Sequence, residues 1–126
     1  KDIEYLKQKV DAGADYIVTQ MFFNNADFFN FRDECRMAGI KVPIIPGLKI
    51  LNNPKQLTSI PKNFFVNIPT ELSEEIEKNL KHTREIGVEW CVKQCEELLD
   101  SGLMTIHFYI MSGAKAVTKV LKKLNK

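Results

Sequence analysis

The feature that most constrains the fold of this chain is a regular alternation of helical and extended segments. Apolar residues recur at helical spacing in residues 2–14, 26–38, 73–101 and 114–124. Short runs rich in β-branched and aromatic residues lie between them, at residues 16–21, 42–47, 64–69 and 105–110. Strands that alternate with helices predict parallel pairing with right-handed crossovers. The expected fold class is therefore α/β.

Local signals mark where the predicted helices begin and end. Asn53 suits an N-cap, Pro54 suits a first helical turn, and Gln56 stands where a capping box places its side chain. Gly39 and Gly102 follow two of the helical segments, as helix-terminating glycines do. The predicted order is one helix followed by four strand–helix units, with a break in the long helical stretch near residues 82–87.

Two architectures share this order of elements. One is a small doubly wound sheet, which the order alone favours, and the other is half of an eight-stranded (β/α)8 TIM barrel. A complete barrel needs about 250 residues, and this chain has 126. No Gly-rich G-x-G-x-x-G turn follows any strand, which counts against a nucleotide-binding doubly wound sheet. Thr105, His107 and Tyr109 share one face of the last predicted strand, and a barrel interior can hold such a polar layer.

Composition excludes several classes of partner and site. A net charge of +2 gives no reason to expect nucleic acid or an anionic membrane surface. No apolar run approaches the roughly 18 residues of a membrane span, so no membrane partner is expected. The three cysteines include Cys91 and Cys95, which share a helix face without a nearby histidine, so no metal site and no disulfide framework are expected. These features favour a cytoplasmic protein.

Four segments, in this order along the chain, carry a family resemblance. They are residues 6–15 (LKQKVDAGAD), 19–23 (TQMFF), 44–48 (IIPGL) and 107–109 (HFY). Their succession resembles methylenetetrahydrofolate reductase and covers essentially the whole chain. The resemblance implies that residues 1–126 are one unit, the C-terminal half of the catalytic barrel, with four parallel strands alternating with helices.

The resemblance also implies an activity. The family comprises flavoproteins, oxidoreductases of one-carbon metabolism and methionine biosynthesis that reduce 5,10-methylenetetrahydrofolate to 5-methyltetrahydrofolate. NAD(P)H gives hydride to FAD, and the folate then takes hydride from the reduced flavin in the same pocket. The alternation of elements leaves one alternative open, a doubly wound binding or interaction module without catalysis. A response-regulator-like module of that kind would want acidic residues at the end of its first strand, and residues 16–23 contain none.

Four residues match positions that line the family's active site. Gln20, at the end of a predicted strand, matches a glutamine that contacts the folate, and its amide can both donate and accept hydrogen bonds. Gln56 matches a second folate-pocket glutamine, although it also completes the capping box. Lys9 and Asp2 match positions that line the FAD site, although both would also suit the exposed face of an amphipathic helix.

The chain also departs from the family. The general acid, a glutamate on the first strand, and an aspartate near the flavin would both precede Lys1. Residues 110–114 (IMSGA) replace a stretch that often holds an arginine near the folate. If Gly113 takes the arginine position, either this contact to the folate tail is missing or a basic residue elsewhere substitutes. We therefore expect the isolated chain to be inactive and to bind FAD weakly or not at all. Its open sheet edges predict association with the remainder of the barrel or with a second copy, as an oligomer.

Overall fold

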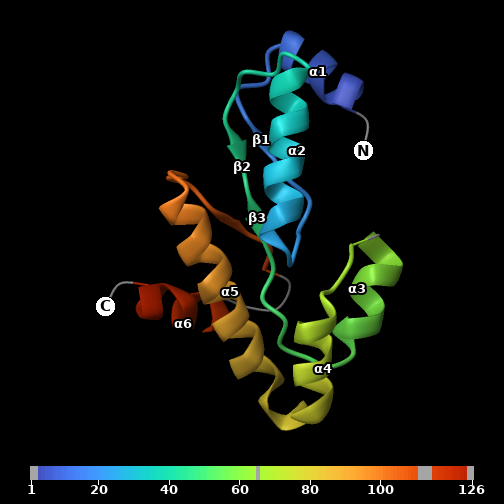
Figure 1. Cartoon of the computed structure of the whole chain (residues 1–126), viewed down its shortest axis with the longest axis vertical. Coiled ribbons are helices and arrows are strands. Elements are labelled where there is room, and N and C mark those ends of the chain that lie inside the picture. Colours follow the sequence, from blue (N-terminus) through green and yellow to red (C-terminus); the bar gives the residue numbers. More distant parts are fainter. Residues whose placement is uncertain (1–2, 65, 111–114, 125–126) are drawn as a thin grey trace.

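The computed structural model describes residues 3–64, 66–110 and 115–124, and Figure 1 shows their arrangement. The helices are α1 (Ile3–Asp11), α2 (Asn25–Met37), α3 (Gln56–Phe64), α4 (Thr70–Lys78), α5 (Thr83–Asp100) and α6 (Lys115–Leu124), with a short 3-10 turn η1 (Leu80–His82) before α5. The strands are β1 (Ile17–Val18), β2 (Ile44–Ile45), β3 (Gly47–Leu48) and β4 (His107–Phe108). The α/β class predicted from the alternation is confirmed.

The strands pair in parallel, as predicted. β1 pairs with β2, so that Ile17 lies opposite Ile44, and β3 pairs with β4, so that Gly47 lies opposite His107. Pro46 separates β2 from β3, and its carbonyl oxygen still accepts a hydrogen bond from the His107 amide at 2.9 Å. Residues 44–48 therefore form one extended segment that lies between β1 and β4.

The prediction of a strand at residues 64–69 was wrong. Phe64 is the last residue of α3, and residues 66–69 form an irregular segment that leads into α4. Val66 is buried in a side-chain cluster with Leu72 and Ile76, so the apolar character of this run reflects core packing and not strand pairing. Among the described residues, β1 to β4 make up three extended segments, namely β1, residues 44–48 and β4, where a half-barrel would have four.

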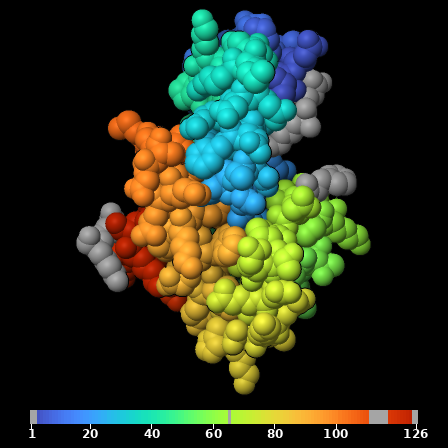
Figure 2. All heavy atoms as spheres, viewed as in Figure 1, coloured from blue at the N-terminus to red at the C-terminus, as the bar shows by residue number. Residues whose placement is uncertain are grey.

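Two clusters of buried side chains hold the elements together. The first packs α2, α5 and α6 against one face of the strands and includes Phe28, Leu48, Cys95 and Leu98. The second lies around α3 and α4 and includes Phe23, Leu51, Ile60, Leu72 and Ile76. Burial of such side chains contributes about 1.5–3 kcal/mol each in the usual accounting. The molecule is elongated, with α1 and α2 at one end of its long axis and α4 with the turn before α5 at the other (Figure 2).

The helices at both ends of the chain were predicted correctly, but the long helical stretch divides earlier than expected. The break lies at residues 79–82, and Gly87 is inside α5. A Cβ atom on residue 87 would lie 2.0 Å from the Leu51 carbonyl oxygen, so the glycine serves a close approach of α5 to the backbone after β3. In the part of the chain that the structure describes, no helix is long and apolar enough to cross a membrane.

Candidate functional site

The two faces of the strands differ in character. Leu48 and Ile50 both belong to the helix-facing core, and side chains of an extended segment alternate between faces. Gly47 and Lys49 therefore lie on the opposite face. We call this the inner face.

The neighbouring strands obey the same alternation. On β4, Ile106 and Phe108 pack against the helix-facing core, so His107 and Tyr109 lie on the inner face. On β1, Ile17 belongs to that core, which places Val18 and then Gln20 on the inner face. The polar layer predicted for the last strand is thus present, and Gln20 and His107 in it are exposed.

Tyr109 ties the carboxyl ends of the strands together. Its hydroxyl donates to the Thr19 carbonyl oxygen at 2.6 Å, and the Thr19 hydroxyl accepts from the Gly47 amide at 3.0 Å. The rings of Tyr109 and His107 meet edge to face, with 4.7 Å between centroids. Burial raises the pKa of Tyr109 above its ordinary value.

Gln20 lies directly beyond β1 and faces open space. It lines a cavity of ≈ 500 Å³ together with Asn67 and with Phe31 of the helix-facing core, and a smaller one of ≈ 200 Å³ together with Tyr5 and Phe31. Its side-chain oxygen accepts a hydrogen bond from the Met21 amide at 3.0 Å. Its side-chain nitrogen makes no hydrogen bond to the described residues and remains available to a ligand.

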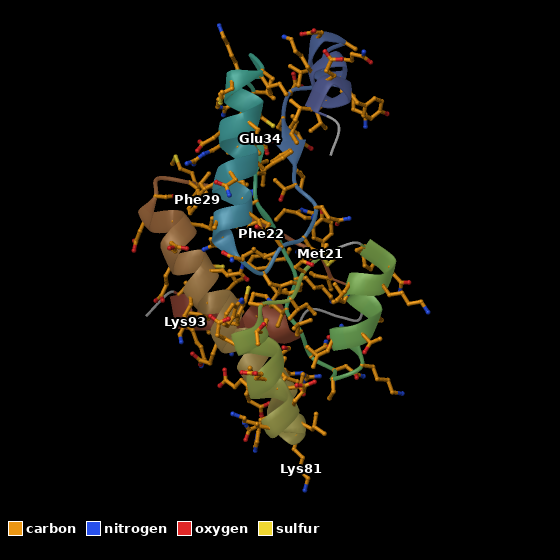
Figure 3. The ribbon with its side chains drawn as sticks, turned by 45° about the vertical axis from the view of Figure 1, so that its right-hand side comes forward. Met21, Phe22, Phe29, Glu34, Lys81 and Lys93 are labelled. Carbon is orange, nitrogen blue, oxygen red and sulfur yellow. The ribbon has the colours of Figure 1, made fainter. Side chains whose placement is uncertain are left out.

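The loop after Gln20 is fixed by α5. The Trp90 indole N–H donates to the Phe23 carbonyl oxygen at 2.8 Å, and the Gln94 amide nitrogen donates to the Phe22 carbonyl oxygen at 3.2 Å. Figure 3 shows Phe22 and Met21 in the middle of the molecule. Phe22 and Phe23 are buried in the two core clusters, so their role is to anchor this loop and hold Gln20 at the strand end.

Gln56 occupies the helix start that the sequence predicted. Its side-chain oxygen accepts hydrogen bonds from the amides of Asn52, at 2.8 Å, and Asn53, at 3.1 Å, while Asn53 Oδ1 accepts from the Lys55 amide at 2.9 Å. The capping role of Gln56 is confirmed. Gln56 follows β3 as Gln20 follows β1, so both lie at the carboxyl ends of parallel strands, although Gln56 lines neither cavity of Gln20.

Of the two residues expected near FAD, the structure describes only Lys9. Lys9 is exposed on α1, with its ammonium 4.8 Å from the centre of the Tyr5 ring, and it does not line the cavities of Gln20. Among the described residues it forms no ion pair, so its charge is available to an anion such as a pyrophosphate. Asp2 lies outside the described residues.

Lys49 is a candidate that the sequence reasoning missed. Its side chain is only 4% exposed, and burial lowers its pKa below the ordinary value. The signal was visible in the sequence, because Lys49 is the single charged residue in the apolar run at 44–51. Lysine is almost never fully buried without a partner.

The cysteines give no sign of a metal centre. Cys35, Cys91 and Cys95 are buried free thiols. A hydrogen bond to Cys95, together with burial, raises the pKa of the Cys91 thiol well above its ordinary value. Within residues 3–64, 66–110 and 115–124, no group of three or more His, Cys, Asp or Glu side chains is placed to hold a metal ion.

Comparison with known proteins gives a consistent result. The family described as methylenetetrahydrofolate reductase matches residues 1–125. The chain is 36% identical over 126 residues to methylenetetrahydrofolate reductase (NADH) 1 of Zea mays, covering 98% of this chain and 21% of the relative. It is 36% identical over 128 residues to the probable methylenetetrahydrofolate reductase (NADPH) of Caenorhabditis elegans, covering 98% and 19%. It is 34% identical over 117 residues to 5,10-methylenetetrahydrofolate reductase of Salmonella typhimurium, covering 90% and 40%. The chain thus spans about a fifth of the plant and animal relatives and two-fifths of the bacterial one.

Proposed function

This chain belongs to the methylenetetrahydrofolate reductase family, and we propose that it forms part of the catalytic barrel of an FAD-dependent enzyme. That enzyme reduces 5,10-methylenetetrahydrofolate to 5-methyltetrahydrofolate with NAD(P)H. The observation that carries the proposal is the polar inner face at the carboxyl ends of parallel strands, with the exposed Gln20 at its rim. Barrel enzymes build their active sites at this end of the strands.

We propose that the strands are consecutive members of an eight-stranded barrel. The proposal is supported by the parallel pairing of β1 with β2 and of β3 with β4, because neighbouring strands of a barrel are parallel. β1 and β4 each keep one unpaired edge among the described residues, and unpaired edges favour association. The expected partner is the remainder of the barrel or a second copy of the chain. The free thiols favour a cytoplasmic location.

The folate is assigned to Gln20, with Gln56 as a second contact. The free amide nitrogen of Gln20 can donate to an acceptor on the edge of a pterin ring, while the Met21 amide fixes the orientation of the side chain through its oxygen. The oxygen of Gln56 is already committed to two backbone amides, so only its nitrogen can contact the substrate without loss of the cap. The two residues therefore act in different ways, Gln20 as the principal contact.

FAD and the nicotinamide cofactor are assigned by family membership and by the chemistry of α1. Lys9 forms no ion pair with the described residues, so its ammonium, which lies over the Tyr5 ring, suits a pyrophosphate, and Asp2 would accept hydrogen bonds from ribose hydroxyls. FAD, when bound, supplies the hydride transfer chemistry. The names of the relatives include NADH and NADPH forms, which supports a nicotinamide donor without choosing between the two.

The proposal is tested with the whole polypeptide that carries this chain. Purified protein should contain bound flavin, and anaerobic NADH or NADPH should bleach the flavin absorbance. Addition of 5,10-methylenetetrahydrofolate should then restore the absorbance and yield 5-methyltetrahydrofolate. A protein that binds no flavin, or whose reduced flavin is not reoxidised by the folate, would contradict the proposal.

A further inference from the structure

Lys49 is a buried lysine, and the alternation of side chains along the strand places it on the inner face of the sheet. It follows β3 directly, between Leu48 and Ile50, which both face the helix-covered core. The ladder continues beyond β3, because the Tyr109 amide donates to the Leu48 carbonyl oxygen at 2.8 Å. Lys49 thus lies beside Tyr109. It is on the same face as Gly47, two residues further along the strand.

The described part of the chain offers Lys49 no counter-ion. The ion pairs there join His82 with Glu85 and Lys123 with Glu89, and no described acceptor takes a hydrogen bond from the Lys49 amine. A side chain with 4% exposure has lost most of its hydration. A lysine in that position keeps its charge only where an anion compensates it, because burial otherwise favours the neutral amine.

The residues around Lys49 on this face carry no negative charge that could neutralise its ammonium group. On the inner face, Tyr109 has a phenol whose hydroxyl donates to the Thr19 carbonyl oxygen, and Gly47 has no side chain. None of these groups carries a negative charge at neutral pH. The charge that matches Lys49 therefore has to come from elsewhere.

We propose that Lys49 is an anion-binding residue of the active site, whose ammonium pairs with an oxyanion of the ligand bound on the inner face. The anion is a glutamate carboxylate of the folate or a phosphate of the dinucleotide cofactor, since both are oxyanions that reach the same end of the strands. This inference rests on the proposed function. Nothing in the sequence match assigns Lys49 this role.

The test uses two variants in the whole polypeptide. Lys49→Met keeps the length of the side chain and removes the charge, and Lys41→Met removes an exposed lysine ahead of β2 as the matched control. Equilibrium binding is measured with two pairs of probes, folic acid against 6-hydroxymethylpterin, and FAD against riboflavin. In each pair only one probe carries the anionic group, together with the aminobenzoyl or adenosine portion attached to it. The melting temperature of each unliganded variant is measured as well.

We expect Lys49→Met to weaken binding of one anionic probe by roughly thirtyfold or more, which is the usual effect of truncating one partner of a buried charge pair. The matching uncharged probe and the Lys41→Met control should change by less than about twofold. Loss with folic acid identifies the carboxylate, and loss with FAD identifies the phosphate. The unliganded variant should melt at the same temperature as the parent or higher, because a desolvated charge has been removed.

Two results would overturn the inference. Unchanged affinity for both anionic probes in Lys49→Met would show that Lys49 does not bind the ligand. A lower melting temperature without a change in affinity would show that Lys49 pairs with a carboxylate of the protein. Failure of the parent protein to bind any of the four probes would instead contradict the proposed function, so the two failures are distinguishable.

Discussion

Tyr109 lies across the backbone of Gly47, close enough that a Cβ atom on residue 47 would stand 2.5 Å from Cε2 of the tyrosine ring. The same Cβ would be 2.7 Å from the Thr19 carbonyl oxygen, which accepts the Tyr109 hydroxyl at 2.6 Å. The last strand is therefore fastened to the first across a glycine in the middle one. This arrangement fixes the carboxyl ends of the strands, where the candidate site lies.

Gly47→Ala should destabilise the protein. The added methyl group would overlap both the ring and a backbone oxygen, and overpacking of this kind typically costs about 1–3 kcal/mol. The measurement is the free energy of unfolding from denaturant titration. In a Tyr109→Ala background the same substitution should cost less, because one of the two clashing groups is gone. Equal costs in both backgrounds would show that the ring does not occupy this position.

Gly87→Ala should also destabilise, against the usual trend for helices. Alanine in a helix interior is normally favoured over glycine by about 1 kcal/mol. Here the new Cβ would lie 2.0 Å from the Leu51 carbonyl oxygen, a backbone atom that cannot rotate away. The clash should dominate, with a net loss of about 1–2 kcal/mol in the free energy of unfolding. A rise in stability would mean that α5 does not approach the segment after β3 this closely.

A comparison of variants at Gln56 and Asn53 can separate the capping role of Gln56 from its proposed role in folate binding. Each side chain accepts backbone hydrogen bonds at the start of α3, so Gln56→Ala and Asn53→Ala should each lower stability by about 1 kcal/mol. Only Gln56→Ala should also weaken folate binding, because Asn53 matches no folate contact. Thermal unfolding and folate titration of the pair give both quantities. Equal folate affinity in the two variants would show that Gln56 caps α3 and does not bind the folate.

Tyr109→Phe should change how stability depends on alkaline pH. Burial raises the pKa of Tyr109 above its ordinary value of 10.0, so the folded state holds this proton more tightly than the unfolded state. The resulting stability is fully present below pH 10 and is lost as the pH rises through the folded pKa. The parent should therefore lose more stability than Tyr109→Phe between neutral pH and pH values above 10. Parallel curves would contradict the burial of the phenol.

Helix patterns and strand direction could be predicted from the sequence because they depend on local spacing. The capping box at Gln56, whose side-chain oxygen accepts from the Asn53 amide at 3.1 Å, is a signal that neighbouring residues in the chain provide. The strand predicted at residues 64–69 was wrong because an apolar run indicates burial but does not show that the backbone pairs with another strand. The helix break was predicted too late in the chain, near residues 82–87, because the reason for Gly87 is a tertiary contact, its close approach to Leu51.

The candidate site was predicted in part. The motif around Gln20 identified a residue that the structure places at a strand end beside a cavity, and the alternation at residues 105–110 identified the polar inner face. Lys49 escaped because its burial depends on strands and helices that pack around it from distant parts of the sequence. Whether Lys9 and Asp2 contact FAD is still a prediction.

The most direct test of the account is the rate at which folate reoxidises the reduced flavin in Gln20→Ala, with Asn30→Ala, an exposed position on α2, as the control. Stopped-flow absorbance follows each half-reaction separately in the whole polypeptide. We predict that reoxidation by 5,10-methylenetetrahydrofolate slows at least about tenfold in Gln20→Ala, as expected when a hydrogen bond worth about 1.4 kcal/mol is lost. Reduction by NAD(P)H should stay within about twofold of the parent. Unchanged reoxidation in Gln20→Ala would contradict the claim that the inner face of this sheet binds the folate.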